Sequence, residues 1–122
     1  SDLGSTYGSR VFPYRTRVRR EYYVKGSDNF KIAKRRAQTG DWDGAAELWG
    51  IEINNSKSKV AGRAYYNMAI SSEINGDLEG AIEWASRAYT DYNDKNALDY
   101  VRILKSRVER IERLRRQGVS EE

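Results

Sequence analysis

The chain has 122 residues, a net charge of +4, no cysteine and no histidine. This length suits one domain with a modest core, and the two missing residue types exclude disulfides, zinc sites, thiol nucleophiles and histidine acid–base chemistry. No apolar stretch of the sequence approaches the roughly 20 residues that span a bilayer. Because the chain has a single proline and is rich in Ala, Leu, Glu, Lys and Arg, it is predicted to be all-α.

The charges are segregated along the chain. Residues 10–36 carry ten Lys or Arg against two acids, residues 41–99 carry five against eleven, and residues 102–116 carry seven against two. Basic ends around an acidic middle are typical of nucleic-acid contact, and they equally fit attraction between the flanks and the body of one chain. The chain starts at Ser1, so a processed protein or a fragment of a larger one is expected.

The N-terminal region is expected to contain a tail and a helix. Residues 1–10 are small and polar, which is typical of a loosely held end. Residues 13–25 are predicted to form a helix, because Pro13 suits a first helical position, Gly26 suits a C-terminal cap, and residues 14, 18 and 22 share one stripe. A strand is the alternative for the run VFPYRTRV at residues 11–18.

Two segments repeat each other at an offset of 36 residues: GDWDGAAELW begins at Gly40 and GDLEGAIEWA begins at Gly76. In each, the glycine suits the left-handed end of one helix and the aspartate caps the next helix. Two antiparallel helical hairpins are therefore expected, the second stacked on the first because one hairpin alone cannot bury both faces. The five helices are predicted at about 27–39, 41–53, 57–75, 78–92 and 95–117.

The repeated residues resemble those of tetratricopeptide repeats. The match is carried by Tyr65, Met68, Ala69, Gly76, Asp77, Ala81 and Ala88, and by Ile32, Ala33, Gly40, Asp41, Trp42, Ala45 and Trp49. The resemblance implies a short right-handed array with repeats at about 27–57 and 62–93, an extra N-terminal helix and a long C-terminal capping helix at about 95–117. Residues 11–118 would form one domain, followed by a short tail at 119–122.

More loosely, the stretch from FPYRTRVRREYY to AIEWASRAY resembles the C-terminal part of an uncharacterised family of predicted bacterial lipoproteins. This resemblance implies a periplasmic or outer-membrane-attached location and a larger parent protein. It assigns no activity. Without this resemblance, the sequence itself gives no localisation, and the cytoplasm is the default expectation.

The tetratricopeptide resemblance also implies a peptide-binding concave surface, lined by the first helix of each hairpin. Basic residues and an asparagine in such a groove can hold a peptide carboxylate through charge-assisted hydrogen bonds. Asn67 matches a residue of the family's Lys/Asn clamp, whereas Phe30 stands where a clamp lysine would be. An ordinary solvated helix surface is the alternative interpretation. The expected groove residues are Lys31, Lys34, Gln38, Arg63, Tyr66, Asn67, Ile70 and Ile74.

Other side chains that suggest chemistry have simpler structural explanations. The aromatic residues Trp42, Trp49 and Tyr65 have the spacing of helix–helix core, and Tyr66 alone is left open as a ligand contact. The acid pairs at 41/43 and 77/79 stand at helix starts, where carboxylates cap the helix and interact favourably with its dipole. Neither set therefore indicates catalysis.

The last predicted helix carries Val101, Leu104, Val108 and Ile111 at 3–4–3 spacing, which is a short coiled-coil seam. Its first half is expected to cap the second repeat. Its distal half would contact the N-terminal helix, a missing part of the chain, or a second copy in a homodimer.

These patterns favour a non-catalytic protein-interaction or scaffolding module that binds a protein or peptide and needs no cofactor and no metal. The alternative is a nucleic-acid-binding domain that uses the basic runs at 15–20 and 107–116. An enzyme is the least favoured class, since no glycine-rich phosphate loop or nucleophile elbow is present.

Overall fold

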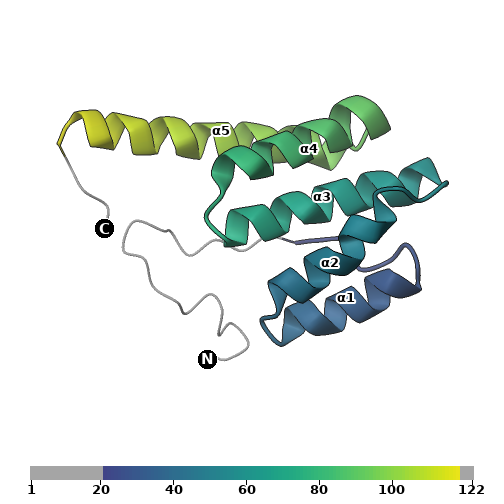
Figure 1. The fold of residues 1–122 in the computed structure, drawn as a ribbon. Coiled ribbons are helices and arrows are strands. Elements are labelled where there is room, and N and C mark those ends of the chain that lie inside the picture. Colours follow the sequence, from purple (N-terminus) through teal and green to yellow (C-terminus); the bar gives the residue numbers. More distant parts are fainter. Residues whose placement is uncertain (1–20, 119–122) are drawn as a thin grey trace.

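The computed structural model describes residues 21–118, which form five helices and no strand. Each helix packs on its neighbours in sequence, so two antiparallel hairpins lie side by side and the last helix covers the second hairpin (Figure 1). The all-α prediction is confirmed, and all ten helix ends fall within one residue of the predicted positions. The helices are α1 (Asp28–Gln38), α2 (Trp42–Glu52), α3 (Ser58–Ile74), α4 (Leu78–Tyr92) and α5 (Lys95–Arg116).

The two repeated Gly-Asp pairs form the turns of the hairpins. Gly40 and Gly76 have φ angles of 85° and 86°, a left-handed geometry that favours glycine because it has no Cβ atom. Asp41 and Asp77 then cap α2 and α4, each accepting a hydrogen bond of 2.9 Å from the backbone amide three residues later. The repeat in the sequence is therefore a repeat of one turn geometry.

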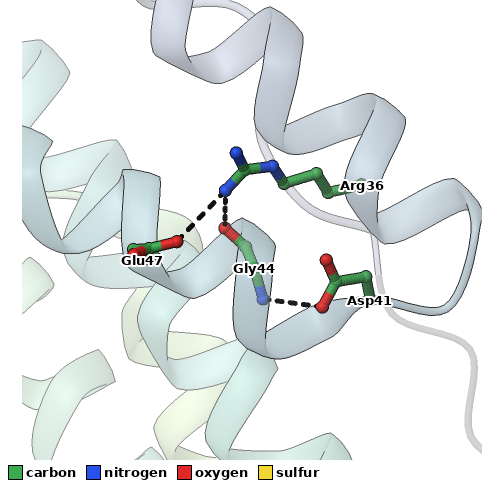
Figure 2. A network of polar contacts seen from close by, with 4 residues as sticks. All are labelled: Arg36, Asp41, Gly44 and Glu47. Carbon is green, nitrogen blue, oxygen red and sulfur yellow. Dashed lines mark hydrogen bonds and ion pairs between the residues drawn. The ribbon is translucent and has the colours of Figure 1, made fainter.

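A side chain from α1 also crosses the first turn. Arg36 donates a hydrogen bond of 2.9 Å to the carbonyl oxygen of Gly44 and pairs with Glu47 at 3.3 Å (Figure 2). Both charged side chains are partly exposed, so the ion pair itself contributes little. The bond to the α2 backbone fixes the end of α1 against the start of α2.

The core runs along the whole stack. Phe30 and Trp49 fill the first hairpin and are fully buried, and burial of each side chain stabilises the fold by about 1.5–3 kcal/mol. Between α3, α4 and α5 the core combines three alanines with larger residues such as Ile70 and Leu104. Small residues let helices approach closely: a Cβ atom added to Gly62 on α3 would lie 2.7 Å from the Cβ of Tyr92 on α4.

The predicted N-terminal helix is wrong for its last residues. Residues 21–25 are not helical; they form an extended segment that runs to α1, and Gly26 precedes α1 instead of capping a helix. The segment is extended because the backbone groups of Tyr23 and Lys25 form hydrogen bonds with side chains of α3 and not with helical backbone partners. The remaining part of that predicted helix, at 13–20, lies outside the described residues, as do the predicted tails.

Helix α5 is anchored to α3 by a buried carboxylate. Glu73 accepts a hydrogen bond of 2.6 Å from the hydroxyl of Tyr100 and forms an ion pair with Arg107. The side chains of Glu73 and Arg107 are 5% and 15% exposed, so both charges are taken out of water and depend on each other. This contact fixes the direction in which α5 leaves the stack.

The predicted seam on α5 divides into two halves. Val101 and Leu104 are buried in the core beneath α5, so they are not available to a second copy. Val108 and Ile111, further along α5, are half-buried, and the C-terminal end of α5 extends past α3 and α4 (Figure 1). Of the described helices, including α5, none is both long enough and apolar enough to cross a membrane.

Candidate functional site

The predicted groove residues lie in two neighbouring places with different surroundings. Those of α1 line an open pocket, whereas those of α3 lie beneath the extended 21–25 segment or in the core. Asn67 and Ile70 are both 0% exposed, so these two do not form the accessible surface that the sequence predicts, and Ile74 is half-buried. The inner face of the second hairpin is thus already occupied by the chain itself.

The side chain of Asn67 forms hydrogen bonds with both backbone polar groups of one residue in this segment, Tyr23. Its Oδ1 accepts a hydrogen bond of 2.8 Å from the Tyr23 amide, and its Nδ2 donates one of 2.7 Å to the Tyr23 carbonyl oxygen. Arg63, one turn earlier on α3, donates a bond of 2.8 Å to the carbonyl oxygen of Lys25. These bonds recognise an extended main chain whatever its side chains, in the way that a neighbouring strand would.

Aromatic contacts hold the side chains of the segment. The Tyr22 ring packs edge-on against Trp42 and Trp49, with ring centroids 5.4 and 5.7 Å apart. The Tyr23 ring packs edge-on against Tyr66 at 5.2 Å, and the guanidinium of Arg63 lies 5.0 Å from its centroid. Edge-to-face and cation–π geometries of this kind add to the energy of simple burial.

The phenol groups of the segment respond to this environment. Burial raises the pKa of Tyr22 above its ordinary value of 10.0. Burial also raises the pKa of Tyr23, although the bond of 3.0 Å that its hydroxyl accepts from Asn96 acts in the opposite direction. Both rings are therefore neutral at physiological pH and bind as aromatic surfaces with a polar tip.

The second place is a pocket of about 720 Å³ beside α1, where the chain leaves the 21–25 segment. Three of the predicted groove residues line it together, at helical spacing on the side of α1 next to its buried residues. The other two cations of this pocket, Lys25 and Arg35, are not among the residues predicted from the sequence. Arg35 directly follows Lys34, and this adjacency is the sequence signal that points to it. The polar lining is Lys25, Ser27, Asp28, Lys31, Lys34, Arg35 and Gln38.

The pocket has an unbalanced positive charge. Four cations face one carboxylate, and the four cations are exposed and make no ion pair within the described part of the chain. A negatively charged group near these four cations is attracted by all of them at once. The screening length at physiological salt is about 8 Å, so this attraction acts over that distance. The pocket is therefore suited to a ligand with several negative charges.

No metal site is found in the part of the chain that the structure describes: residues 21–118 contain no group of three or more Asp or Glu placed to hold an ion together. The acid pairs at the helix starts act as the sequence predicts at Asp41 and Asp77, whose carboxylates cap their helices. Tyr66, left open as a ligand contact, is half-buried and packs between Tyr23 and Tyr100.

Comparison with known proteins gives a family but no activity. The model of a domain of unknown function, DUF6340, matches residues 31–106, which is more than half of the chain. No curated protein and no solved structure matches the chain. The matched range begins within α1 and ends within α5, and it contains the rest of both hairpins, Asn67 and the α1 lysines. The chain belongs to the DUF6340 family.

Proposed function

We propose that this domain is a non-catalytic protein-interaction module of tetratricopeptide type, and that it binds an acidic segment of a partner protein at the α1 pocket. The observation that carries this proposal is the group of four cations that make no ion pair within residues 21–118, beside a groove that already holds an extended chain. Carboxylates of a bound peptide would supply the counter-charges that the described residues do not.

The arrangement of the helices supports the tetratricopeptide part of the proposal. Two hairpins with the same Gly-Asp turn follow one another, and each helix packs on the next in sequence. In repeat arrays of this kind the first helices of successive hairpins share one face. Here α1 and α3 are those helices, and the pocket and the 21–25 segment lie on them. Membership of a larger bacterial lipoprotein is also proposed, and its support is the sequence resemblance alone.

The test is the affinity of a fluorescein-labelled peptide of eight glutamates, measured by anisotropy. Exposed ion pairs are worth about 0.2–1 kcal/mol each, so Lys31→Ala with Lys34→Ala should weaken binding by about 1.4 kcal/mol, or tenfold. The matched control is Lys59→Ala with Lys105→Ala, two exposed lysines that do not line the pocket. This control removes the same charge and should change the affinity less than twofold.

Two outcomes would contradict the proposal. Equal losses in both double variants would mean that net charge alone attracts the peptide. Tighter binding of an eight-nucleotide single strand, lost on Arg110→Ala with Arg113→Ala, would favour the nucleic-acid alternative at residues 107–116. Salt does not separate the two anions, because both should bind more weakly as ionic strength rises.

A further inference from the structure

We propose that the groove between α3 and α5 is a second binding site, for an extended partner segment with two adjacent aromatic residues. Residues 21–25 of the chain are its resident occupant, and the partner segment displaces them. The side chains that build this groove do not line the α1 pocket, so the inference does not rest on that pocket, although Val24 and Lys25 of the resident segment line it.

The backbone contacts define the shape of what the groove accepts. Asn67 is 0% exposed, and its carboxamide is satisfied by the amide and the carbonyl oxygen of a single extended residue. A buried carboxamide without such a partner is costly, so the groove favours an occupied state. Because the contacts are to main-chain atoms, they fit an extended segment of another protein as well as residues 21–25.

The side-chain contacts define the chemistry of the occupant. Its first aromatic ring packs on the indoles of Trp42 and Trp49, and its second lies between the Arg63 guanidinium and the Tyr66 ring. The polar tip of the second ring is bound by Asn96 on α5. Two neighbouring tyrosines make all of these contacts, whereas a single aromatic residue can make only those of one ring.

Two features make exchange of the occupant feasible. The segment is joined to α1 by Gly26 and Ser27 alone and belongs to no helix, so it can leave without unfolding one. A pocket of about 350 Å³ lies beside it, lined among others by Glu21, Asp99 and the 46% exposed Ile103. An incoming segment can begin to bind there while Tyr23 is still in place.

The experiment uses the full chain and a fluorescein-labelled peptide, acetyl-EYYVKGS-amide, which copies residues 21–27. Tyr22→Ala with Tyr23→Ala weakens the resident segment, so the peptide should bind this variant at least tenfold more tightly than the wild type, since the competent state becomes more populated. Adding Asn67→Ala should abolish that gain. A control peptide, acetyl-ESSVKGS-amide, should not bind. Equal affinity for the wild type and the tyrosine variant, or binding of the control peptide, would overturn the inference.

A second measurement needs no variant, in case the tyrosine variant does not fold. In ¹⁵N-labelled wild-type protein, saturating unlabelled EYYVKGS peptide should speed hydrogen exchange of the Tyr23 amide at least threefold, while protected amides of α3 keep their rates. Unchanged exchange at Tyr23 in the presence of the peptide would overturn the inference. The α1 pocket is tested by a different ligand, the octaglutamate peptide. A negative result with the EYYVKGS peptide therefore rejects this inference without rejecting the proposed function, and the reverse also holds.

Discussion

Asn67 and Tyr23 are 44 residues apart in sequence, and the side-chain carboxamide of the first forms both main-chain hydrogen bonds of the second. The Asn67 side chain thus provides the hydrogen bonds that a neighbouring β-strand would provide to an extended chain. The consequence is that the inner face of the second hairpin is closed by the chain, whereas the α1 pocket beside it is open.

Asn67→Ala should lower the free energy of unfolding by about 2–4 kcal/mol. The substitution leaves the Tyr23 amide and carbonyl without partners in a partly buried place, and each unsatisfied group costs about 1–3 kcal/mol. Urea denaturation followed by circular dichroism measures the change. Asn54→Ala, at an exposed position in the α2–α3 loop, is the control and should change the stability by less than about 0.5 kcal/mol. Similar effects of the two substitutions would show that the Asn67 bonds contribute little.

Glu52 should make the stability depend on acid pH. Burial raises the pKa of this carboxylate, but the hydrogen bonds donated by Asn29 (2.8 Å) and Asn55 (3.0 Å) outweigh burial and lower the pKa below 4.5. A lowered pKa means that the folded state binds fewer protons than the unfolded state. The contribution is therefore fully present above about pH 4.5 and is lost as the pH falls through the folded-state pKa.

The measurement is urea unfolding of the wild type and Glu52→Gln between pH 3 and pH 7, with Glu83→Gln as the control for loss of one charge at an exposed position. The stability advantage of the wild type over Glu52→Gln should shrink as the pH falls below 4.5. An advantage that stays constant over this range would mean that ionised Glu52 does not stabilise the fold.

Gly62→Ala and Gly50→Ala should have effects of opposite sign. An added Cβ at 62 would lie 2.7 Å from the Cβ of Tyr92, so α3 and α4 must move apart, at a cost of about 1–3 kcal/mol. A Cβ at 50, within α2, meets no atom within 4 Å, so the better helix propensity of alanine should stabilise by about 0.5–1 kcal/mol. Thermal unfolding measures both, and a stabilised Gly62→Ala would contradict the close approach of α3 and α4.

Arg107→Met should destabilise the protein by about 3 kcal/mol, because it removes the ion pair that Arg107 forms with the buried carboxylate of Glu73. Changing Glu73 to Gln in the same variant removes that charge and should recover part of the loss. Arg102→Met, which breaks an exposed pair with Asp99, should cost less than about 1 kcal/mol. A double variant less stable than Arg107→Met alone would count against a buried, mutually dependent pair.

The hairpins could be predicted from the sequence because their determinants are local. Gly40-Asp41 and Gly76-Asp77 specify a helix end and a helix start within two residues, and apolar spacing gives the rest. The 21–25 segment could not be predicted in this way. Tyr14, Val18 and Tyr22 have helical spacing, but the bonds that hold the segment extended come from Asn67 and Arg63, about 40 residues away.

The candidate site was predictable in part for the same reason. Lys31, Lys34 and Gln38 lie on one helix, so their spacing alone places them together. Asn67 and Ile70 have the spacing of a groove face too, but their burial depends on which segment covers α3, and helical periodicity carries no such information. The two adjacent tyrosines and Val24, which have high β-propensity, were the local signal for an extended chain.

The most direct test of the central claim is an NMR titration of ¹⁵N-labelled protein with the unlabelled octaglutamate peptide. If the α1 pocket binds acidic segments, the largest chemical-shift changes should fall on the amides of Lys25, Lys31, Lys34, Arg35 and Gln38. Changes of equal size at the exposed arginines of α5, or changes confined to residues 107–116, would contradict it.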